Sequence, residues 1–125
     1  MFFSFSVLLW GSVITVHKVL GNGFSESVYQ EALEKEFIKA GVPFERQKQL
    51  SVYYNGVKMK KYFIADFVCY EKIILEIKSV SFLAQNFKHQ VINYLKTTQL
   101  DVGLLINFGE KSLVWKRFIN TTPSV

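Results

Sequence analysis

The stretch from Tyr62 to Ser79, YFIADFVCYEKIILEIKS, constrains the fold of this chain more than any other segment. It holds two runs of β-branched and aromatic residues with a short polar break between them, which predicts two antiparallel strands joined by a turn. Strand side chains alternate between the faces of a sheet. One face is expected to carry Phe63, Ala65, Phe67, Cys69, Ile73, Leu75 and Ile77. The other is expected to carry Ile64, Asp66, Val68, Ile74, Glu76 and Lys78.

The length of the turn decides what lies across from Asp66. A turn of three residues, 70–72, places Asp66 directly opposite Glu76. A turn of two residues would place Asp66 opposite Ile77, because a slip of one residue exchanges the two faces. We expect the three-residue turn.

The charges Asp66, Glu76 and Lys78 allow two interpretations. Two carboxylates paired across strands, about 5 Å apart at Cβ, destabilise a sheet unless something compensates them. A divalent cation such as Mg²⁺, which takes carboxylate and water oxygens as ligands, would do so. Glu76 and Lys78 could equally form an ordinary surface ion pair while Asp66 caps a bend. The spacing favours the ordinary pair, whereas the apolar surroundings favour the cation.

Composition limits the class of protein. A chain of 125 residues with 50% hydrophobic residues has the size of one globular domain. A formal net charge of +5 suits an anionic partner such as nucleic acid, although it is not extreme. The single cysteine, Cys69, excludes an internal disulfide, and we expect it in the core of a cytoplasmic protein.

The first sixteen residues, MFFSFSVLLWGSVITV, are unusually apolar. They resemble the apolar part of a signal peptide, but no basic residue precedes them. They are also shorter than the roughly 20 apolar residues of a transmembrane helix. We therefore expect a helix or strand that packs on the domain or faces a partner, with membrane association disfavoured. The predicted organisation is this segment (1–16), one domain (17–120) and a short tail (121–125).

The remaining chain alternates between helical and strand patterns. Residues 24–40 predict a helix with an N-cap at Ser25, a stop at Gly41, and a buried stripe of Val28, Ala32, Leu33 and Phe37. Residues 47–54 and the run from 57 onward predict a hairpin around Asn55-Gly56. Along it lie Lys48, Lys58, Lys60 and Lys61, interleaved with tyrosines. Such a pattern suits phosphate contacts, although a solvated strand would look the same.

The last third of the chain predicts one helix and two strands. The helix covers 83–97 and would bury Leu83, Phe87, Val91, Tyr94 and Leu95, with Gln90 at the edge of that stripe. Residues 102–108, VGLLINF, predict a strand buried on both faces. Residues 113–118 predict a final strand.

This order of elements, with D-x9-ExK across the central strands, resembles the PD-(D/E)xK nuclease superfamily, and within it the GxxExxY family of small bacterial proteins. The resemblance rests on VHKVLGNGF at 16–24, GFSESVY at 23–29, Ala32-Leu33, IAD at 64–66, LEIKS at 75–79, Gln90 with NYL at 93–95, and GLLINFG at 103–109. It implies an α/β (α+β) restriction-endonuclease-like core: a helix, a three-stranded antiparallel meander, a helix and one or more strands, in a mixed sheet flanked by helices. The apolar segment before residue 17 departs from the more polar helix of that family.

The resemblance also implies an activity, the metal-dependent hydrolysis of phosphodiester bonds in nucleic acid, with DNA favoured over RNA. Asp66 and Glu76 would bind Mg²⁺, or Mn²⁺ in its place, with the Ile77 carbonyl as a further ligand. Glu26 would complete the acidic cluster through water. Lys78 would act on the attacking water and the phosphate. Gln90 would reach toward the metal or the scissile phosphate.

Two other classes of function remain open from the sequence. The chain could be a non-catalytic nucleic-acid-binding or regulatory module that keeps the nuclease fold, because function depends on the site rather than on the fold. It could also be an interaction protein that forms a homo-oligomer, or binds another protein, through residues 1–16.

Overall fold

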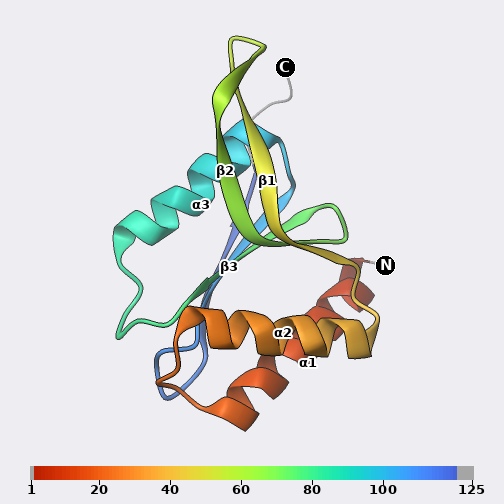
Figure 1. Ribbon diagram of the computed structural model, residues 1–125, viewed down its shortest axis with the longest axis vertical. Coiled ribbons are helices and arrows are strands. Elements are labelled where there is room, and N and C mark those ends of the chain that lie inside the picture. Colours follow the sequence, from red (N-terminus) through yellow and green to blue (C-terminus); the bar gives the residue numbers. More distant parts are fainter. Residues whose placement is uncertain (1, 121–125) are drawn as a thin grey trace.

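The computed structural model describes residues 2–120, with side chains from Val7 onward, so the predicted tail at 121–125 lies outside it. The elements, in order, are α1 (Phe2–Leu20), α2 (Glu26–Ala40), β1 (Phe44–Tyr54), β2 (Val57–Cys69), β3 (Ile73–Lys78), α3 (Gln85–Thr98), β4 (Val102–Asn107) and β5 (Val114–Ile119). They form one five-stranded sheet in the order β1-β2-β3-β4-β5 (Figure 1). Only β3 and β4 pair in parallel, so the sheet is mixed and the predicted α+β fold class is confirmed.

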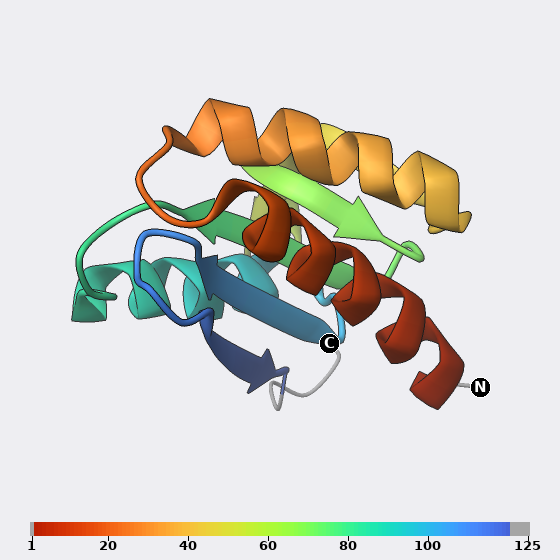
Figure 2. The ribbon, with the colours of Figure 1, turned by 90° about the horizontal axis from the view of Figure 1, so that it is seen from below.

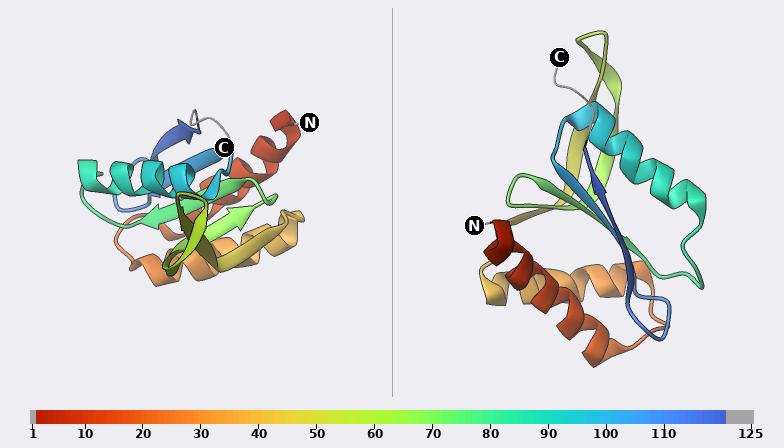
Figure 3. Two further views of the ribbon diagram at one scale, coloured as in Figure 1. Left: turned by 90° about the horizontal axis from the view of Figure 1, so that it is seen from above. Right: turned by 180° about the vertical axis from the view of Figure 1, so that it is seen from behind.

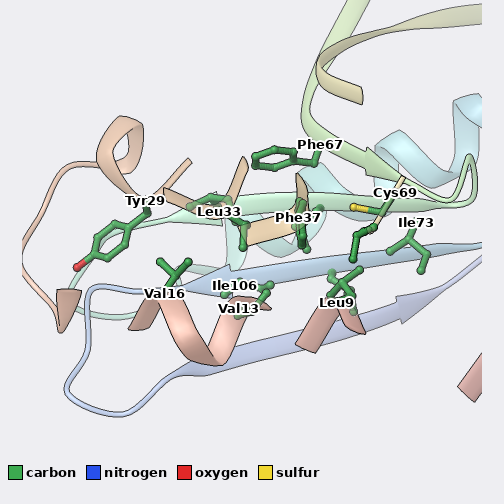
Figure 4. Packing of buried hydrophobic residues seen from close by; sticks show 14 of the residues in the cluster. Leu9, Val13, Val16, Tyr29, Leu33, Phe37, Phe67, Cys69, Ile73 and Ile106 are labelled. Carbon is green, nitrogen blue, oxygen red and sulfur yellow. The ribbon is translucent and has the colours of Figure 1, made fainter. Parts of the chain in front are cut away.

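The sheet separates two helical layers. Helices α1 and α2 cover one face, and α3 covers the other (Figure 2). The larger core lies under α1 and α2, where helix side chains such as Leu33 and Phe37 meet strand side chains such as Phe67 and Ile106 (Figure 4). A smaller core under α3 joins Tyr94 and Leu95 to the strands.

Helix α1 contributes to the larger core through one side only. Leu9, Val13 and Val16 are at most 2% exposed. The helix continues to Leu20, where Gly21 leaves it with a left-handed φ of +67°. Among the residues that the structure describes, no helix combines the length and apolar content needed to cross a bilayer.

Helix α2 ends as predicted but is rotated relative to the predicted stripe. Gly41 adopts a left-handed φ of +75°, which allows the helix to close on its last carbonyls. The prediction was wrong for Val28, which is 39% exposed, while Tyr29 is fully buried. The reason is tertiary, because the Tyr29 ring stacks on Phe108 at 4.6 Å between centroids and thereby sets the rotation of the helix.

The β1–β2 hairpin is confirmed. Asn55 and Gly56 both have positive φ angles, 49° and 77°, as a type I′ turn requires. Its outer half extends beyond the rest of the sheet (Figure 3).

Strand β2 is strongly curved (Figure 1), and its pairing with β1 is interrupted at Asp66. Residues of β1 and β2 pair on either side of Gln47 and Asp66, but not at these two positions, and Gln47 has a left-handed φ of +53°. The prediction of one common face for the whole strand was therefore wrong. Ala65 belongs to the α3 side, and Phe67 and Cys69 belong to the α1–α2 side. The register is the same on both sides of Gln47 and Asp66 and shifts farther out, between Ser51 and Tyr53. The strand turns about its own axis at Gln47 and Asp66, so it presents a different side beyond them.

Helix α3 begins at Gln85, two residues later than predicted, so Leu83 precedes it. Its buried residues are Val91, Tyr94 and Leu95, while Phe87 is only half-buried. The helix lies so close to β4 that a Cβ atom added at Gly103 would approach Val91 Cγ1 to 2.5 Å. Strand β4 is buried at every position, as predicted.

Candidate functional site

The turn between β2 and β3 has three residues, as predicted. Cys69 pairs with Ile73, and the pairing continues to Phe67 and Leu75. The same register places Asp66 across from Glu76. The sequence pattern therefore predicted correctly which residues the two strands bring together.

At Asp66 and Glu76, hydrogen bonds from side chains replace the backbone hydrogen bonds between β2 and β3. The backbone N–H of Asp66 donates to Glu76 Oε1 at 3.3 Å, and the N–H of Ile77 donates to Asp66 Oδ2 at 2.7 Å. Each carboxylate thus binds the backbone of the opposite strand with one oxygen. The two carboxyl groups also interact with each other, and this contact lowers the pKa of Asp66 and raises that of Glu76.

Burial makes this pair of carboxylates electrostatically unfavourable. Glu76 is 4% exposed, and Asp66 is half-buried. Burial, and then the charge of Asp66, raise the pKa of Glu76 from 4.5 to about 9. Burial also raises the pKa of Asp66, although the hydrogen bond from Ile77 opposes that rise. The pair therefore needs a proton or a cation at neutral pH.

Lys78 is near the carboxylates but is not paired with them. Its charge lowers the pKa of both groups, but its Nζ lies over the ring of Phe87, 4.5 Å from the centroid. Within residues 7–120, ion pairs join Arg46 to Glu34 and Lys48 to Glu45, and none joins Lys78 to Glu76. The alternative of an exposed ion pair between Glu76 and Lys78 is thus not what the structure shows.

Glu26 lies at the first position of α2, half-buried. Two contacts bring this end of the helix to the site. Ser79 Oγ, at the end of β3, donates to the carbonyl of Phe24 at 2.5 Å. Gln30, one turn after Glu26, accepts a hydrogen bond at 2.8 Å from Gln47, which faces Asp66 on β1. In the part of the chain that is described, no three acidic, His or Cys side chains converge on one point, so Glu26 is not joined to the carboxylate pair.

Gln90 is exposed on α3. It lies one helical turn from Phe87, which contacts Lys78, and one turn from Tyr94. This spacing puts Gln90 at the rim of the site rather than within it.

Tyr94 is a residue near the site whose contact with the acidic pair the sequence did not suggest. Its side chain is 6% exposed, and its ring packs against Phe63 at 4.5 Å. Burial, and then the negative charges of Glu76 and Asp66, raise its pKa to about 12. In the sequence Tyr94 is part of an apolar stripe, so its position gave no signal of a polar role.

Asn107, at the end of β4, is the second residue that the sequence did not identify. It is fully buried. Its amide accepts from the N–H groups of Val80 and Gly109, both at 3.0 Å, and donates to the Val80 carbonyl and Glu110 Oε2, both at 2.9 Å. These bonds fix the chain just after Lys78. The sequence did contain one signal for Asn107: it is a polar residue within a strand that is buried on both faces, where a polar group needs hydrogen-bond partners.

The predicted nucleic-acid-binding lysines are not all together. Lys58, Lys60 and Lys61 are exposed on the outer half of the hairpin. Lys48 lies nearer the body of the protein, 2.6 Å from Glu45. A cavity of 350 Å³ opens beside Lys48, between β1 and the end of α3, but Asp66 and Glu76 do not line it.

The sequence model of the PD-(D/E)XK nuclease superfamily matches residues 5–118. This chain belongs to that superfamily. The crystal structure of SSO0001 has a similar fold, with a TM-score of 0.59 and 17% identity over 78% of this chain. The aligned part is 52% of that structure, so this chain spans about half its length. No curated protein matches the sequence.

Nucleases of this superfamily typically use divalent metals and bind nucleic acid. The pair Asp66–Glu76 fits a divalent cation in its chemistry. It offers hard oxygen donors, Glu76 is buried, and no ion pair within the described residues compensates the two carboxylates.

Proposed function

We propose that this protein is a metal-dependent nuclease that hydrolyses phosphodiester bonds, DNA in preference to RNA. The observation that carries the proposal is the buried pair Asp66–Glu76, placed where β2 and β3 stop pairing and in need of a proton or a cation at neutral pH. A structural role alone would be served better by apolar residues, because a buried pair of like charges costs stability.

The donor set supports specific roles. Asp66, Glu76 and the carbonyl of Ile77 would hold Mg²⁺, or Mn²⁺ in its place, and Glu26 would complete the acidic cluster through water. A bound divalent metal supplies an acidified water and neutralises charge on the phosphate. The chain's own residues orient the substrate around it. Gln90 would contact the phosphate from the rim of α3.

Lys78 would act on the attacking water and stabilise negative charge on the phosphate. To do so its ammonium group leaves the Phe87 ring, over which it lies in the structure. A cation over an aromatic ring is held weakly, by roughly 0.5–1 kcal/mol at exposed sites, so this displacement is cheap.

The proposal has two further parts. The protein would belong to the GxxExxY family, and its phosphate contacts would come from Lys48, Lys58, Lys60 and Lys61. The family assignment is supported by Tyr29, whose hydroxyl donates to the Gly21 carbonyl at 2.5 Å. This bond ties Gly21-Asn22-Gly23, part of the VHKVLGNGF motif at 16–24, to the helix that carries Glu26.

A non-catalytic nucleic-acid-binding or regulatory module is the second candidate function. It is favoured by one observation, that Glu26 is not joined to the carboxylate pair within residues 2–120. Such a module would bind DNA in a salt-dependent way without cutting it, and Asp66→Ala would leave that binding unchanged.

The outward side of α1 supports a protein partner, with a second copy of the chain as the simplest choice. It exposes the apolar side chains of Val7, Leu8, Ile14 and Val19. Sedimentation of the wild type and of Ile14→Glu over a range of concentrations tests this. Self-association that the substitution abolishes would support it.

The test of the nuclease function compares three proteins: wild type, Glu76→Ala, and Glu71→Ala, an exposed acidic residue of the β2–β3 turn. Calorimetric titration with Mg²⁺ and Mn²⁺ is expected to show saturable binding to the wild type and to Glu71→Ala, but not to Glu76→Ala. On gels, the wild type and Glu71→Ala should cleave single- or double-stranded DNA, and Glu76→Ala should not. Equal heats for all three proteins, with DNA intact throughout, would exclude the nuclease function.

A further inference from the structure

We propose that one face of the β1–β2 hairpin is a stacking platform for single-stranded nucleic acid, formed by Tyr53 and Tyr62 with Lys58 and Lys60 beside them. This face is called the outer face below. The inference rests on the proposed function, for which it names the class of substrate.

Positive charge is concentrated in the part of the hairpin between Glu45 and Asp66. Between Arg46 and Ala65 there are five basic residues and no acidic residue. The rest of the chain has ten of each sign and is formally neutral, although the chain as a whole is +5. An anionic polymer would therefore be drawn to the hairpin rather than to the protein in general.

The pairing of the strands puts both tyrosines and Lys58 on the same side. Tyr53 pairs with Lys58, and residues directly opposite in a sheet share a face. Tyr62 pairs with Ser51, which lies two residues before Tyr53 on β1, so Tyr62 is on that face as well. The register shifts between these two pairs, and Lys60 lies in the shifted segment between Lys58 and Tyr62. Ser51, the partner of Tyr62, leaves the space beside its ring unfilled by a large side chain.

The outer face is turned away from the protein core. Its opposite face contains Phe63, whose ring packs on Tyr94 of α3, and the buried Leu50. On the outer face Tyr53 and Tyr62 are 53% and 49% exposed. Neither ring stacks on another aromatic ring within the described residues.

Exposed tyrosines beside lysines suit unpaired bases. Bases stack on aromatic rings whatever their identity, while ammonium groups follow the phosphates. Sheets that bind single-stranded RNA use aromatic residues on a strand surface in this way. A duplex keeps its bases stacked on each other, so their faces are not free to stack on exposed tyrosines, whereas a single strand presents them. The outer face therefore favours a single strand.

The platform and the carboxylate pair lie on opposite sides of the sheet. The outer face is turned away from α3, whereas Asp66 and Glu76 lie near Tyr94 of α3, and Lys78 lies over Phe87 of the same helix. The platform is therefore a binding surface separate from the carboxylate pair.

The test uses the full chain with Asp66→Asn and EDTA, so that binding is measured without metal or cleavage. Fluorescence anisotropy of a labelled oligothymidine, and of a duplex of the same length, reports the two affinities. We expect the single strand to bind at least tenfold more tightly. Equal or tighter binding of the duplex would overturn the proposal.

Matched variants separate the outer face from the other one. Tyr53→Ala and Tyr62→Ala should each weaken single-strand binding by about tenfold, the order found when a stacking aromatic is lost, with an unchanged salt dependence. Tyr54→Ala is the control, because Tyr54 is 67% exposed but pairs with Val57 on the opposite face. A loss as large for Tyr54→Ala as for Tyr62→Ala would contradict the assignment of the face. Tyr62→Phe should retain binding.

The lysines are tested by the salt dependence of binding. Lys58→Gln and Lys60→Gln should each lower the slope of log K against log salt by about 0.7, whereas Lys35→Gln, at an exposed position of α2 away from the hairpin, should leave it unchanged. Equal slopes for all three variants would count against the platform. Failure here is distinguishable from failure of the nuclease function, because cleavage by the wild type can persist without the platform, and binding to the platform can persist without cleavage.

Discussion

The two ends of strand β2 differ more than any other neighbouring parts of the molecule. The inner end, Asp66 to Cys69, is buried, paired with β3, and adjacent to an excess of negative charge. The outer end, Val57 to Tyr62, is exposed and basic, and it extends beyond the helices. One strand therefore joins a buried acidic pair to an exposed basic segment. A protein that must bring a metal and a phosphate chain together gains from having both on one rigid element.

The largest expected difference between the two ends is in stability. Phe67 is fully buried between Phe37 and Phe44, whereas Tyr62 is half-exposed. We expect Phe67→Ala to lower the free energy of unfolding by about 3–5 kcal/mol and Tyr62→Ala by less than about 0.5 kcal/mol. Urea unfolding measures both. Similar losses for the two variants would show that the hairpin is part of the core.

The next largest effect is expected on catalysis. Lys78→Met should slow DNA cleavage by about 10²–10³-fold, the order seen when one stabiliser of transition-state charge is removed. Metal binding should persist, because the carboxylate pair is intact. Lys72→Met, in the exposed β2–β3 turn, is the control and should cleave normally. If Lys78→Met cleaved DNA at the wild-type rate, the role proposed for Lys78 would be wrong.

The dependence of stability on pH sharpens the contrast in charge. Because the folded pKa of Glu76 is about 9, above its ordinary 4.5, the metal-free folded protein keeps a proton that the unfolded chain releases in this range. Its contribution to stability is complete below pH 4.5 and is lost as the pH rises toward 9. We expect the free energy of unfolding to fall by at most about 1.4 kcal/mol per pH unit within this window.

The measurement is thermal or urea unfolding at several pH values in EDTA. Glu76→Gln should flatten the profile, and Glu71→Gln should leave it unchanged. Saturating Mg²⁺ should also flatten it in the wild type, because a cation stabilises the ionised carboxylate. A wild-type profile that stays level in EDTA would mean that Glu76 is ionised in the folded protein.

The smallest expected effect concerns the resting position of Lys78. Phe87→Leu removes the ring under its ammonium group and should lower stability by about 0.5–1 kcal/mol, without slowing cleavage. Phe82→Leu is the matched control, because Phe82 is 70% exposed and makes no ring contact with a residue that the structure describes. Slower cleavage in Phe87→Leu alone would instead make Phe87 a positioning residue for Lys78.

Local patterns predicted most of the fold and the centre of the site. Alternation and the three-residue turn were sufficient to pair Asp66 with Glu76, and Asn55-Gly56 was sufficient for the hairpin. Both features depend on backbone geometry within a few residues. The rotation of α2 was not predictable in this way, because it depends on the stacking of Tyr29 on Phe108, far away in the chain.

The sequence by itself determined the register of the central strands, the positions of the acidic pair and of Lys78, and the concentration of positive charge on the hairpin. Only the tertiary structure decided the burial of Glu76, the position of Lys78 over Phe87, and the contacts of Tyr94 and Asn107. It also decided the interruption of pairing at Gln47 and Asp66, where Gln47 is left-handed. The physical reason is that periodicity assigns a side chain to a face, whereas burial and electrostatic partners depend on what other segments bring to that face.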